Sequence, residues 1–320
     1  MKYLSILLVI CFLSCGKQAP KETYRITYQF ENPDAIDDSA VLRTVNTIKN
    51  RLNQFTRDYE LLIGKDKRLE LTIRTDVDIV RLNTLVSNEG ALEFWECLDL
   101  NTASEFIYMF DEEVSKNIET TTSSNNFTIE QLLEETTPFS SLFGPPDYSS
   151  NSFFTVAVKD TALVNNYMNS HYAKAVKRNE YRNIDLLYGH LPVNDVIGVF
   201  FVQSNPNRKA LINETHITYA RQNYNSIGNP SVTIQMNDLG ANRWERMTTN
   251  AFNNKTRIAV CLNGKVMTAP TVSVAGIVGG STEISGSFTE EEAIDLSLVL
   301  STKERIPKLI VVDTAIIADE

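Results

Sequence analysis

The sequence predicts an α+β fold in which two βαββαβ segments, one at each end of the chain, form a common base around an inserted α+β domain. The first observation is that the same order of strand and helix periodicities occurs in residues 23–100 and again in residues 228–313. The second is that residues 101–227 do not follow this order and are interrupted by polar stretches, glycines and prolines. The third is the length of 320 residues, which suits two domains of about 150 residues each.

The composition is that of a globular protein and excludes several function classes. Hydrophobic residues make up 42% of the chain and charged residues 22%, which excludes collagen-like, coiled-coil and wholly disordered chains. Thirty Lys and Arg residues against 40 Asp and Glu residues give a formal charge of −10. The chain therefore lacks the basic surface that nucleic-acid binding requires.

The N-terminal residues have the pattern of an export signal. Lys2 supplies a positive charge, and the mostly apolar residues 3–13 are too few for a membrane-spanning helix, which needs about 20 residues. Residues 12–16, FLSCG, resemble a bacterial lipobox, in which cleavage precedes the cysteine and the cysteine receives lipid. We predict a signal peptide at residues 1–14, lipidation of Cys15 and a polar tether over residues 15–22. The protein would then lie in the cell envelope, anchored by lipid on the periplasmic side of a membrane; a plain secretory signal with a chance cysteine is the alternative.

Each element of the first βαββαβ segment has its own signal. Apolar and polar residues alternate over residues 24–30, the period of a half-buried strand. Asp37 can cap the next helix, whose apolar positions recur every three or four residues, and Asp78 lies at the start of the second helix. A charged turn at residues 64–67 separates two short strand patterns. The predicted elements are strand 24–30, helix 41–55, strands 59–63 and 68–74, helix 79–86 and strand 91–98.

The second segment repeats this order with a glycine-rich addition over residues 272–285. Asn263-Gly264 is a strong signal for a type I′ turn between two strands. Thr289 and Glu292 fit a capping box, which places acidic residues at a helix N-terminus. The predicted elements are strand 232–236, a helix from Asp238, strands 256–262 and 265–268, a helix from residue 290 and strand 308–313.

Residues 101–227 are predicted to be a separate inserted domain. Five aromatic residues near its turns offer either transient apolar contacts or a core for this domain: Phe139, Phe143, Tyr148, Phe153 and Phe154. The two connections to the base are expected to lie side by side, where Gly and Pro residues allow either a hinge or ordinary rigid connections. The predicted hinge consists of Leu98, Asp99, Leu100, Asn101, Gly228, Asn229 and Pro230.

Ordered motifs over most of the chain resemble the first periplasmic domain of SecD-type protein-export proteins. In the first half these are TVNTIKNRLNQF at residues 44–55 and GALEF at 90–94. In the second half they are NPSV at 229–232, GANRW at 240–244, MT at 247–248, IAVCLNG at 258–264, TAP at 268–270, GG at 279–280, ISG at 284–286 and FTEEEA at 288–293. DTALVN at 160–165 and LPVND at 191–195 are similar to the fused SecDF form of Bacteroidetes-type bacteria.

The resemblance implies a ferredoxin-like base with an inserted head that swings relative to it. Members of the family help the Sec translocon to move preproteins outside the cytoplasmic membrane, driven by protons. This sequence departs from the family in lacking the glycine-rich motif ahead of the first strand, where residues 19–22 read APKE. It also shows no transmembrane stretch with the charged residues that carry protons. We therefore expect the binding part of the mechanism without the motor.

The sequence offers little for catalysis, metal binding or a cofactor. His171, His190 and His216 lie far apart without a second ligand at metal-binding spacing, so we predict no metal site. Cys97 and Cys261 lie on predicted strands, either as a disulfide or as two core thiols. No nucleophile elbow or calcium loop is present, and the Gly279-Gly280 pair has no following phosphate-loop lysine. The chain is accordingly predicted not to be an enzyme and to need no cofactor.

Three functions follow as hypotheses. The first is a non-catalytic accessory of protein translocation that binds preprotein, unfolded polypeptide or components of the Sec translocon, with no nucleic acid involved. The second is an envelope lipoprotein that uses the same fold as an assembly module with a folded partner. The third is a hydrolase whose site is not visible in the sequence.

Overall fold

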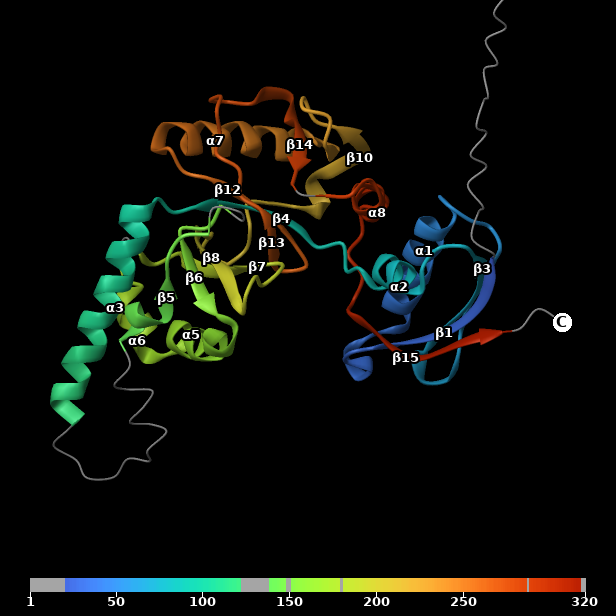
Figure 1. The fold of residues 1–320 in the computed structure, drawn as a ribbon, viewed down its shortest axis with the longest axis horizontal. Coiled ribbons are helices and arrows are strands. Elements are labelled where there is room, and N and C mark those ends of the chain that lie inside the picture. Colours follow the sequence, from blue (N-terminus) through green and yellow to red (C-terminus); the bar gives the residue numbers. More distant parts are fainter. Residues whose placement is uncertain (1–20, 122–137, 148–150, 179–180, 287, 318–320) are drawn as a thin grey trace, which may run out of the picture.

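Two lobes joined by two short crossings make up the protein (Figure 1). The computed structural model describes residues 21–121, 138–147, 151–178, 181–286 and 288–317, so Cys15 and the predicted signal peptide lie outside the described residues. We call residues 22–87 with 309–317 the terminal lobe, and residues 92–301 the large lobe. In the described ranges, no helix is both long and apolar enough to cross a membrane. The predicted α+β class is confirmed.

The terminal lobe is a single βαββαβ unit. Its elements are β1 (Glu22–Phe30), α1 (Asp38–Leu52), β2 (Tyr59–Ile63), β3 (Leu69–Thr75), α2 (Ile79–Ser87) and β15 (Leu309–Ile317), with 3-10 turns at Pro33–Ala35 and Lys65–Lys67. The sheet is antiparallel in the order β15-β1-β3-β2, which is the ferredoxin-like arrangement. Both helices cover one face of this sheet (Figure 1), and Ile26, Tyr28, Ile48 and Leu71 are fully buried between the layers.

The strand that closes this sheet is not the predicted one. Residues 91–98 were expected to close it, but β4 (Leu92–Cys97) lies in the large lobe and β15 pairs with β1 instead. Leu92 and Phe94 of β4 pack into one core, while Trp95 and Cys97 pack into another. A strand that is apolar on both faces requires cover on both faces. The terminal sheet has helices on only one face, so β4 is more stable in the large lobe.

Residues 231–313 do not form a second half of a shared base. Their strands divide between two sheets of the large lobe, and only β15 returns to the terminal lobe. The reason is that two of these strands pack against the same core from opposite layers. One contributes Val232 and Ile234, and the other contributes Ile258 and Val260. Strands that face each other across a core cannot also lie edge to edge in one sheet. The predicted duplication is therefore corrected to one βαββαβ unit closed by the last strand.

The large lobe is built from two sheets with helices packed on them. The elements are β4, α3 (Leu100–Thr121), β5 (Phe143–Gly144), β6 (Phe154–Ala157), α5 (Thr161–Asn169), α6 (His171–Val176), β7 (Ile184–Gly189), β8 (Val196–Gln203), β9 (Ile212–Asn213), β10 (Ile217–Tyr224), β11 (Pro230–Met236), α7 (Asp238–Asn254), β12 (Ile258–Leu262), β13 (Lys265–Thr268), β14 (Ser281–Ser285) and α8 (Glu290–Ser301). Short 3-10 turns lie at Phe139–Leu142, Val158–Asp160, Glu214–His216 and Val278–Gly280. One sheet has the order β10-β11-β14 and the other β5-β6-β8-β7-β13-β12-β4-β9.

Five strands of the longer sheet close into a small barrel. The closure arises because β4 pairs with β8 as well as with β12, which gives the ring β8-β7-β13-β12-β4. Along these strands, every second residue packs into the core inside the barrel. The residues between them pack into two further cores outside it. The barrel core contains Trp95, Cys97, Phe200, Val202, Ala259, Cys261 and Val266. Helices α3, α5 and α6 cover one outer core, and α7, α8 and the three-stranded sheet cover the other.

The local signals in the sequence are confirmed. Asp37 accepts a hydrogen bond from the amide of Ala40 at 2.6 Å and caps α1. Thr289 and Glu292 form the predicted capping box of α8. Asn263 and Gly264 both have positive φ, at 52° and 75°, as a type I′ turn requires. Short-range physical chemistry therefore determines these features wherever the segment lies in the fold.

Candidate functional site

The two lobes are joined by residues 88–91 and residues 302–308, and these crossings lie side by side. The amide of Ile306 donates to the carbonyl of Glu89 at 2.9 Å, and Arg305 Nη2 lies 3.2 Å from a carboxylate oxygen of Glu89. Gly90 adopts a φ of +75°, and a Cβ there would lie 3.2 Å from Arg51 Nη2. Two adjacent short crossings therefore exist, but at other residues than predicted.

The predicted hinge residues lie inside the large lobe. Asp99 caps the start of α3 by accepting hydrogen bonds from the amides of Asn101 and Thr102, and the Leu98 amide donates to Phe201 on β8. Gly228, with a φ of +83°, lies in the tight turn between β10 and β11, which ends at Pro230. Rotation at these residues would not move one lobe against the other. Gly228 and Pro230 therefore belong to the β10–β11 hairpin and not to a hinge.

A buried arginine holds the first crossing against the terminal lobe. Arg51 on α1 is fully buried, and its Nη1 donates to the carbonyls of Leu85, Val86 and Asn88 at 3.1, 3.4 and 2.6 Å. These carbonyls lie at the C-terminus of α2, where helical partners are missing and a cation is favoured. Nε and Nη2 of Arg51 have no hydrogen-bond partner within the described residues. Burial lowers the pKa of Arg51 to about 10, which leaves it protonated at neutral pH.

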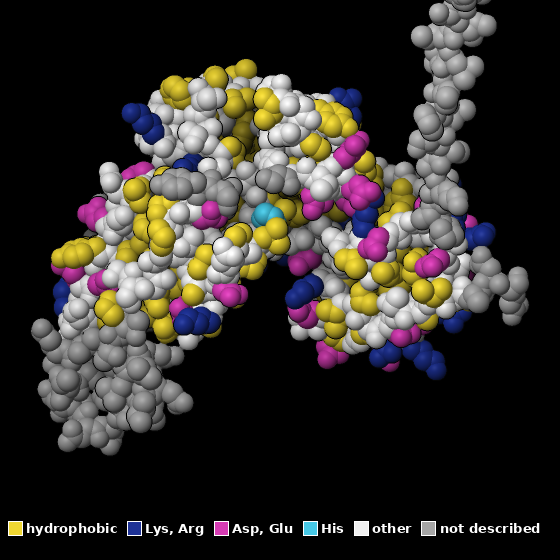
Figure 2. Space-filling view, viewed as in Figure 1, with side chains coloured by type: hydrophobic (Ala, Val, Ile, Leu, Met, Phe, Trp, Pro, Cys, Tyr) yellow, Lys and Arg dark blue, Asp and Glu magenta, His cyan; other side chains and the backbone are white. Residues whose placement is uncertain are grey.

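Polar contacts hold the helices of the two lobes together. Arg81 on α2 pairs with Asp295 on α8 through two hydrogen bonds of 2.8 and 2.9 Å, and its third nitrogen lies 3.2 Å from Glu291. Hydrogen bonding to Asp295 raises the pKa of Arg81. Figure 2 shows acidic side chains gathered over α8, where the two lobes meet. Gln54 of α1 also donates to Ser301 at 3.3 Å. Such a polar contact between domains is of the kind that can open without exposing an apolar core.

We expect Arg81→Gln to loosen the lobes without unfolding either of them. A partly exposed bidentate ion pair contributes about 0.5–1 kcal/mol, so separated arrangements should become about two- to fivefold more populated. Single-molecule energy transfer between one dye on each lobe would show a broader distance distribution. Arg68→Gln removes the same charge from an exposed site in the same lobe and should leave the distribution unchanged. An identical distribution for both variants would show that the ion pair does not hold the lobes.

A groove with a volume of about 340 Å³ lies beside the barrel in the large lobe. Its lining combines apolar, amide and charged side chains from β4, β7, α5 and the segments near α6 and β9. The residues are Glu93, Trp95, Asn165, Met168, Asn169, Lys177, Asp185, Leu186, Leu187 and Arg208. This volume lies within the range of pockets that bind ligands in proteins.

Charge in the groove is arranged around Asp185. Lys177 Nζ lies 3.5 Å from a carboxylate oxygen of Asp185, and Arg208 Nε lies 3.9 Å from the same oxygen. Burial lowers the pKa of Lys177, and Asp185 partly offsets this effect. On the opposite side, burial raises the pKa of Glu93, which accepts a hydrogen bond from Trp95 Nε1 at 3.2 Å. The groove therefore presents donors, acceptors and partly exposed apolar surface together.

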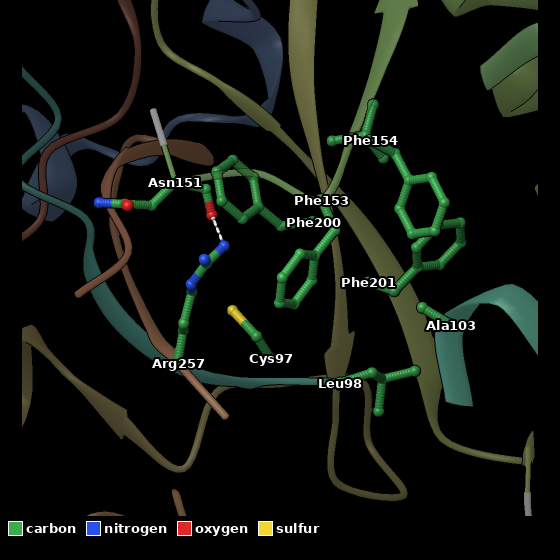
Figure 3. A pocket seen from close by; sticks show the side chains of 10 residues that line it. Cys97, Leu98, Ala103, Asn151, Phe153, Phe154, Phe200, Phe201 and Arg257 are labelled. Carbon is green, nitrogen blue, oxygen red and sulfur yellow. Dashed lines mark hydrogen bonds between the residues drawn. The ribbon is translucent and has the colours of Figure 1, made fainter. Parts of the chain in front are cut away.

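A second pocket, next to Cys97, is too small to bind a ligand (Figure 3). Its volume is about 10 Å³, at the limit for one water molecule. Arg257 closes it, because its guanidinium lies 4.2 Å from the ring centre of Phe153 and donates to the carbonyl of Asn151. Phe139 is fully buried, and Phe143 and Phe154 pack against the same core. Those aromatic residues thus form the core of the lobe, while Tyr148 lies outside the described residues.

The histidines and cysteines have structural partners and do not converge. His216 is buried, and its Nε2 lies 2.9 Å from Arg243 Nη1; burial and this cation lower its pKa. Cys97 and Cys261 are separate buried thiols in the barrel core. Among the residues that the structure describes, no three His, Cys, Asp or Glu side chains are placed to hold a metal ion.

Both barrel thiols should resist alkylation in the folded protein. Burial raises the pKa of Cys97 to about 12, from an ordinary value of 9.0, so its thiolate fraction at pH 8 should fall about a thousandfold. Burial also raises the pKa of Cys261. Peptide mapping after treatment with N-ethylmaleimide should show both unmodified until denaturant is added. Ser104→Cys, at an exposed position of α3, is the accessible control; equal rates at Cys97 and at the introduced thiol would contradict the closed barrel core.

Sequence reasoning missed the groove, Arg51 and the Arg81–Asp295 pair. Arg81 and Asp295 are 214 positions apart in the chain, and the groove draws on several separate segments. One signal was present: Arg51 lies on the apolar side of α1, between Ile48 and Leu52. A basic residue at an inward position predicts a buried acceptor, although it does not say which one.

Comparison with known proteins gives matches along much of the chain. The family model for the P1 head subdomain of SecDF matches residues 202–303. The protein translocase subunit SecD of Magnetococcus marinus is 36% identical over 93 residues, which cover 29% of this chain and 17% of that protein. SecD of Rhodothermus marinus is 26% identical over 319 residues, which cover 87% of this chain and 49% of that protein. The chain thus spans about half or less of these relatives.

A solved structure supports the fold. The crystal structure of SecDF in a super-membrane-facing form superimposes with a TM-score of 0.52 at 18% identity, covering 92% of this chain and 30% of that one. The resemblance to a SecD-type periplasmic domain is confirmed. The matched head subdomain includes β10, β11, α7, β12, β13, β14 and α8. Most of these elements lie in residues 228–313, which the sequence predicts as part of the base, so the predicted boundaries differ from those of the family model.

Proposed function

We propose that this chain, whose sequence and fold resemble those of a SecD-type periplasmic domain, is a non-catalytic accessory of protein export that binds polypeptide in the groove beside its barrel. The observation that carries this proposal is the lining of the groove. Leu186 and Leu187, which are partly exposed, offer apolar contacts next to the exposed amides of Asn165 and Asn169. Such a combination binds a main chain together with one or two apolar side chains.

The polar contact between the lobes supports a role in which the large lobe changes its orientation. The crossings at residues 88–91 and 302–308 join the lobes, and the Arg81–Asp295 pair can separate at small cost. A polypeptide bound on the large lobe would move with it. The hinge in this proposal lies at the crossings, because residues 98–101 and 228–230 are internal to the large lobe.

Photocrosslinking in cells tests the binding role. A photoreactive amino acid at Asn169, which lines the groove, should crosslink to preproteins during their export. Asn166 is exposed on the same helix outside the groove lining and is the matched control. Equal or absent crosslinking at the two positions would refute groove binding. A single stoichiometric partner at Asn169 would instead favour the assembly-module function.

We also propose that lipid at Cys15 holds the protein at the periplasmic side of a membrane. Three acyl chains bind a membrane firmly, whereas one binds it only marginally. Radiolabelled palmitate should enter the wild-type protein, and Cys15→Ala should abolish the label. Cys11→Ala, which leaves the FLSCG motif intact, should label normally. Equal labelling of wild type and Cys15→Ala would contradict the anchor.

A further inference from the structure

The last strand of the terminal lobe has an open edge and, after Leu309, which packs into the terminal core, it is largely exposed. β15 is the end strand of its sheet, and no strand in the described ranges pairs with its outer side. Seven consecutive residues, 310–316, are exposed. Four of them are large and apolar: Ile310, Val311, Val312 and Ile316, with exposed fractions of 42, 42, 43 and 65%. Natural proteins normally protect such an edge, because it pairs readily with another chain.

The backbone groups that face outward can be assigned from the strand register. The Glu31 amide donates to the Lys308 carbonyl, and Leu309 pairs with Phe30 in register. In an antiparallel ladder, bonded and non-bonded pairs alternate. Leu309 and Val311 therefore direct their amides and carbonyls away from β1, whereas Ile310 directs its own toward β1. After Val311 a bulge leaves Val312 without a partner in the ladder.

The other edge of the same sheet, β2, is shorter, and it exposes two large apolar side chains, Leu62 and Ile63. It has five residues, whereas β15 has nine, and charged residues flank it at Asp58 and Lys65. The Gly64 amide donates to the Arg68 carbonyl, so Ile63 also directs its amide outward. Each strand contains one acidic residue, Asp313 in β15 and Glu60 in β2. β15 is therefore the longer open edge, and it exposes four large apolar side chains against two on β2.

We propose that β15 is a docking site for an extended, mainly apolar segment of an unfolded polypeptide that carries a Lys or Arg, which pairs with β15 as an additional strand. This occupant rests on the proposed function, in which the protein binds chains during export. Main-chain bonds to Leu309 and Val311 supply affinity, and the exposed apolar side chains supply contacts on both faces. A basic residue opposite Asp313 would form a favourable cross-strand pair.

A second copy of this chain fits the edge less well. Full antiparallel pairing of two copies of β15 is centred on residue 313, so the two Asp313 carboxylates would lie directly opposite each other. Like charges in that position destabilise a strand pair. Each copy also has a formal charge of −10, which opposes association. With a basic incoming strand, both the pairing opposite Asp313 and the interaction with the net negative charge become favourable.

The test measures binding of a labelled peptide of alternating valine and threonine with one central lysine to the full chain by fluorescence anisotropy. Val311→Pro removes one outward amide and leaves the ladder to β1 in place, so binding should weaken about tenfold. Val311→Thr keeps the amide and should bind normally. Ile63→Pro makes the same change on the β2 edge and should have no effect. A peptide with aspartate in place of lysine should bind several-fold more weakly.

Distinct outcomes would overturn the proposal. Equal binding by wild type and Val311→Pro, or equal losses for Val311→Pro and Ile63→Pro, would exclude β15 as the site. Sedimentation that shows a dimer lost in Val311→Pro would identify a second copy as the occupant. Crosslinking at Asn169 in cells is independent of these results. If that crosslinking persists while the peptide does not require β15, the proposed function stands and only this docking site fails.

Discussion

A chain that ends at Lys308 is expected to lose the terminal lobe while the large lobe remains folded. β15 supplies one of four strands and pairs with β1 along its whole length, with one bulge. Without β15, the remaining unit has fewer than about 70 residues, and β1 loses the strand that pairs with one of its edges. Domains of this size are only marginally stable. Amide exchange in β1 and β3 should accelerate at least a hundredfold, equivalent to about 2.7 kcal/mol.

Hydrogen exchange read by mass spectrometry separates the lobes in one experiment. Protection over residues 22–87 should disappear, and protection over residues 92–301 should persist. A chain that ends at Ile317 is the matched control, because it keeps β15, and it should exchange like the full chain. Persistent protection of residues 22–87 after removal of β15 would mean that another strand closes the terminal sheet, as the sequence had suggested for residues 91–98.

Arg51→Ala is expected to destabilise the terminal lobe by about 3–4 kcal/mol. The substitution removes the donor for three carbonyls at the end of α2 and opens a cavity where a fully buried side chain had been. Arg51→Met keeps most of the volume and also removes the cost of burying a cation, so it should lose about half as much. Urea titration of each variant, followed through exchange of terminal-lobe amides, gives the difference in free energy of unfolding.

Arg43→Ala is the control for this series. Arg43 is exposed on the same helix and its Nη1 donates to the Ser39 hydroxyl, so its removal should change stability by less than about 0.5 kcal/mol. If Arg51→Met proves as stable as wild type, the carbonyls of Leu85, Val86 and Asn88 do not depend on the guanidinium. If Arg51→Ala affects only the large lobe, the assignment of the crossing to the terminal lobe is wrong.

Local structure followed from the sequence because it depends on residues a few positions apart. The Asp37 cap, the capping box at Thr289 and the turn at Asn263-Gly264 all involve side chains and amides within three or four residues of each other. The alternation in β1 and the apolar stripe of α1 likewise predicted their buried faces. Residue periodicity is enough for such features, since an amphipathic element buries its apolar face wherever it lies.

The choice of partners for the strands did not follow. The sequence predicts strands at residues 91–98 and 308–313, and either of them could close the same βαββα unit. What decides is that β4 has apolar side chains on both faces and is buried between two cores, whereas β15 tolerates exposure. That preference depends on the cover available in the large lobe, which no local window contains.

The sequence by itself determined the helix caps, the Asn263-Gly264 turn, the buried faces of β1 and α1 and the α+β class, and it showed the resemblance to SecD-type domains. Only the tertiary structure decided that the lobes divide at residues 88–91 and 302–308, that Arg81 meets Asp295, and that one strand edge stays open. The physical reason is that caps, turns and amphipathic faces depend on neighbours in the chain. Strand pairing and ion pairing across lobes depend on which surfaces of other elements are available to bury each strand or side chain. Those elements are distant in the sequence.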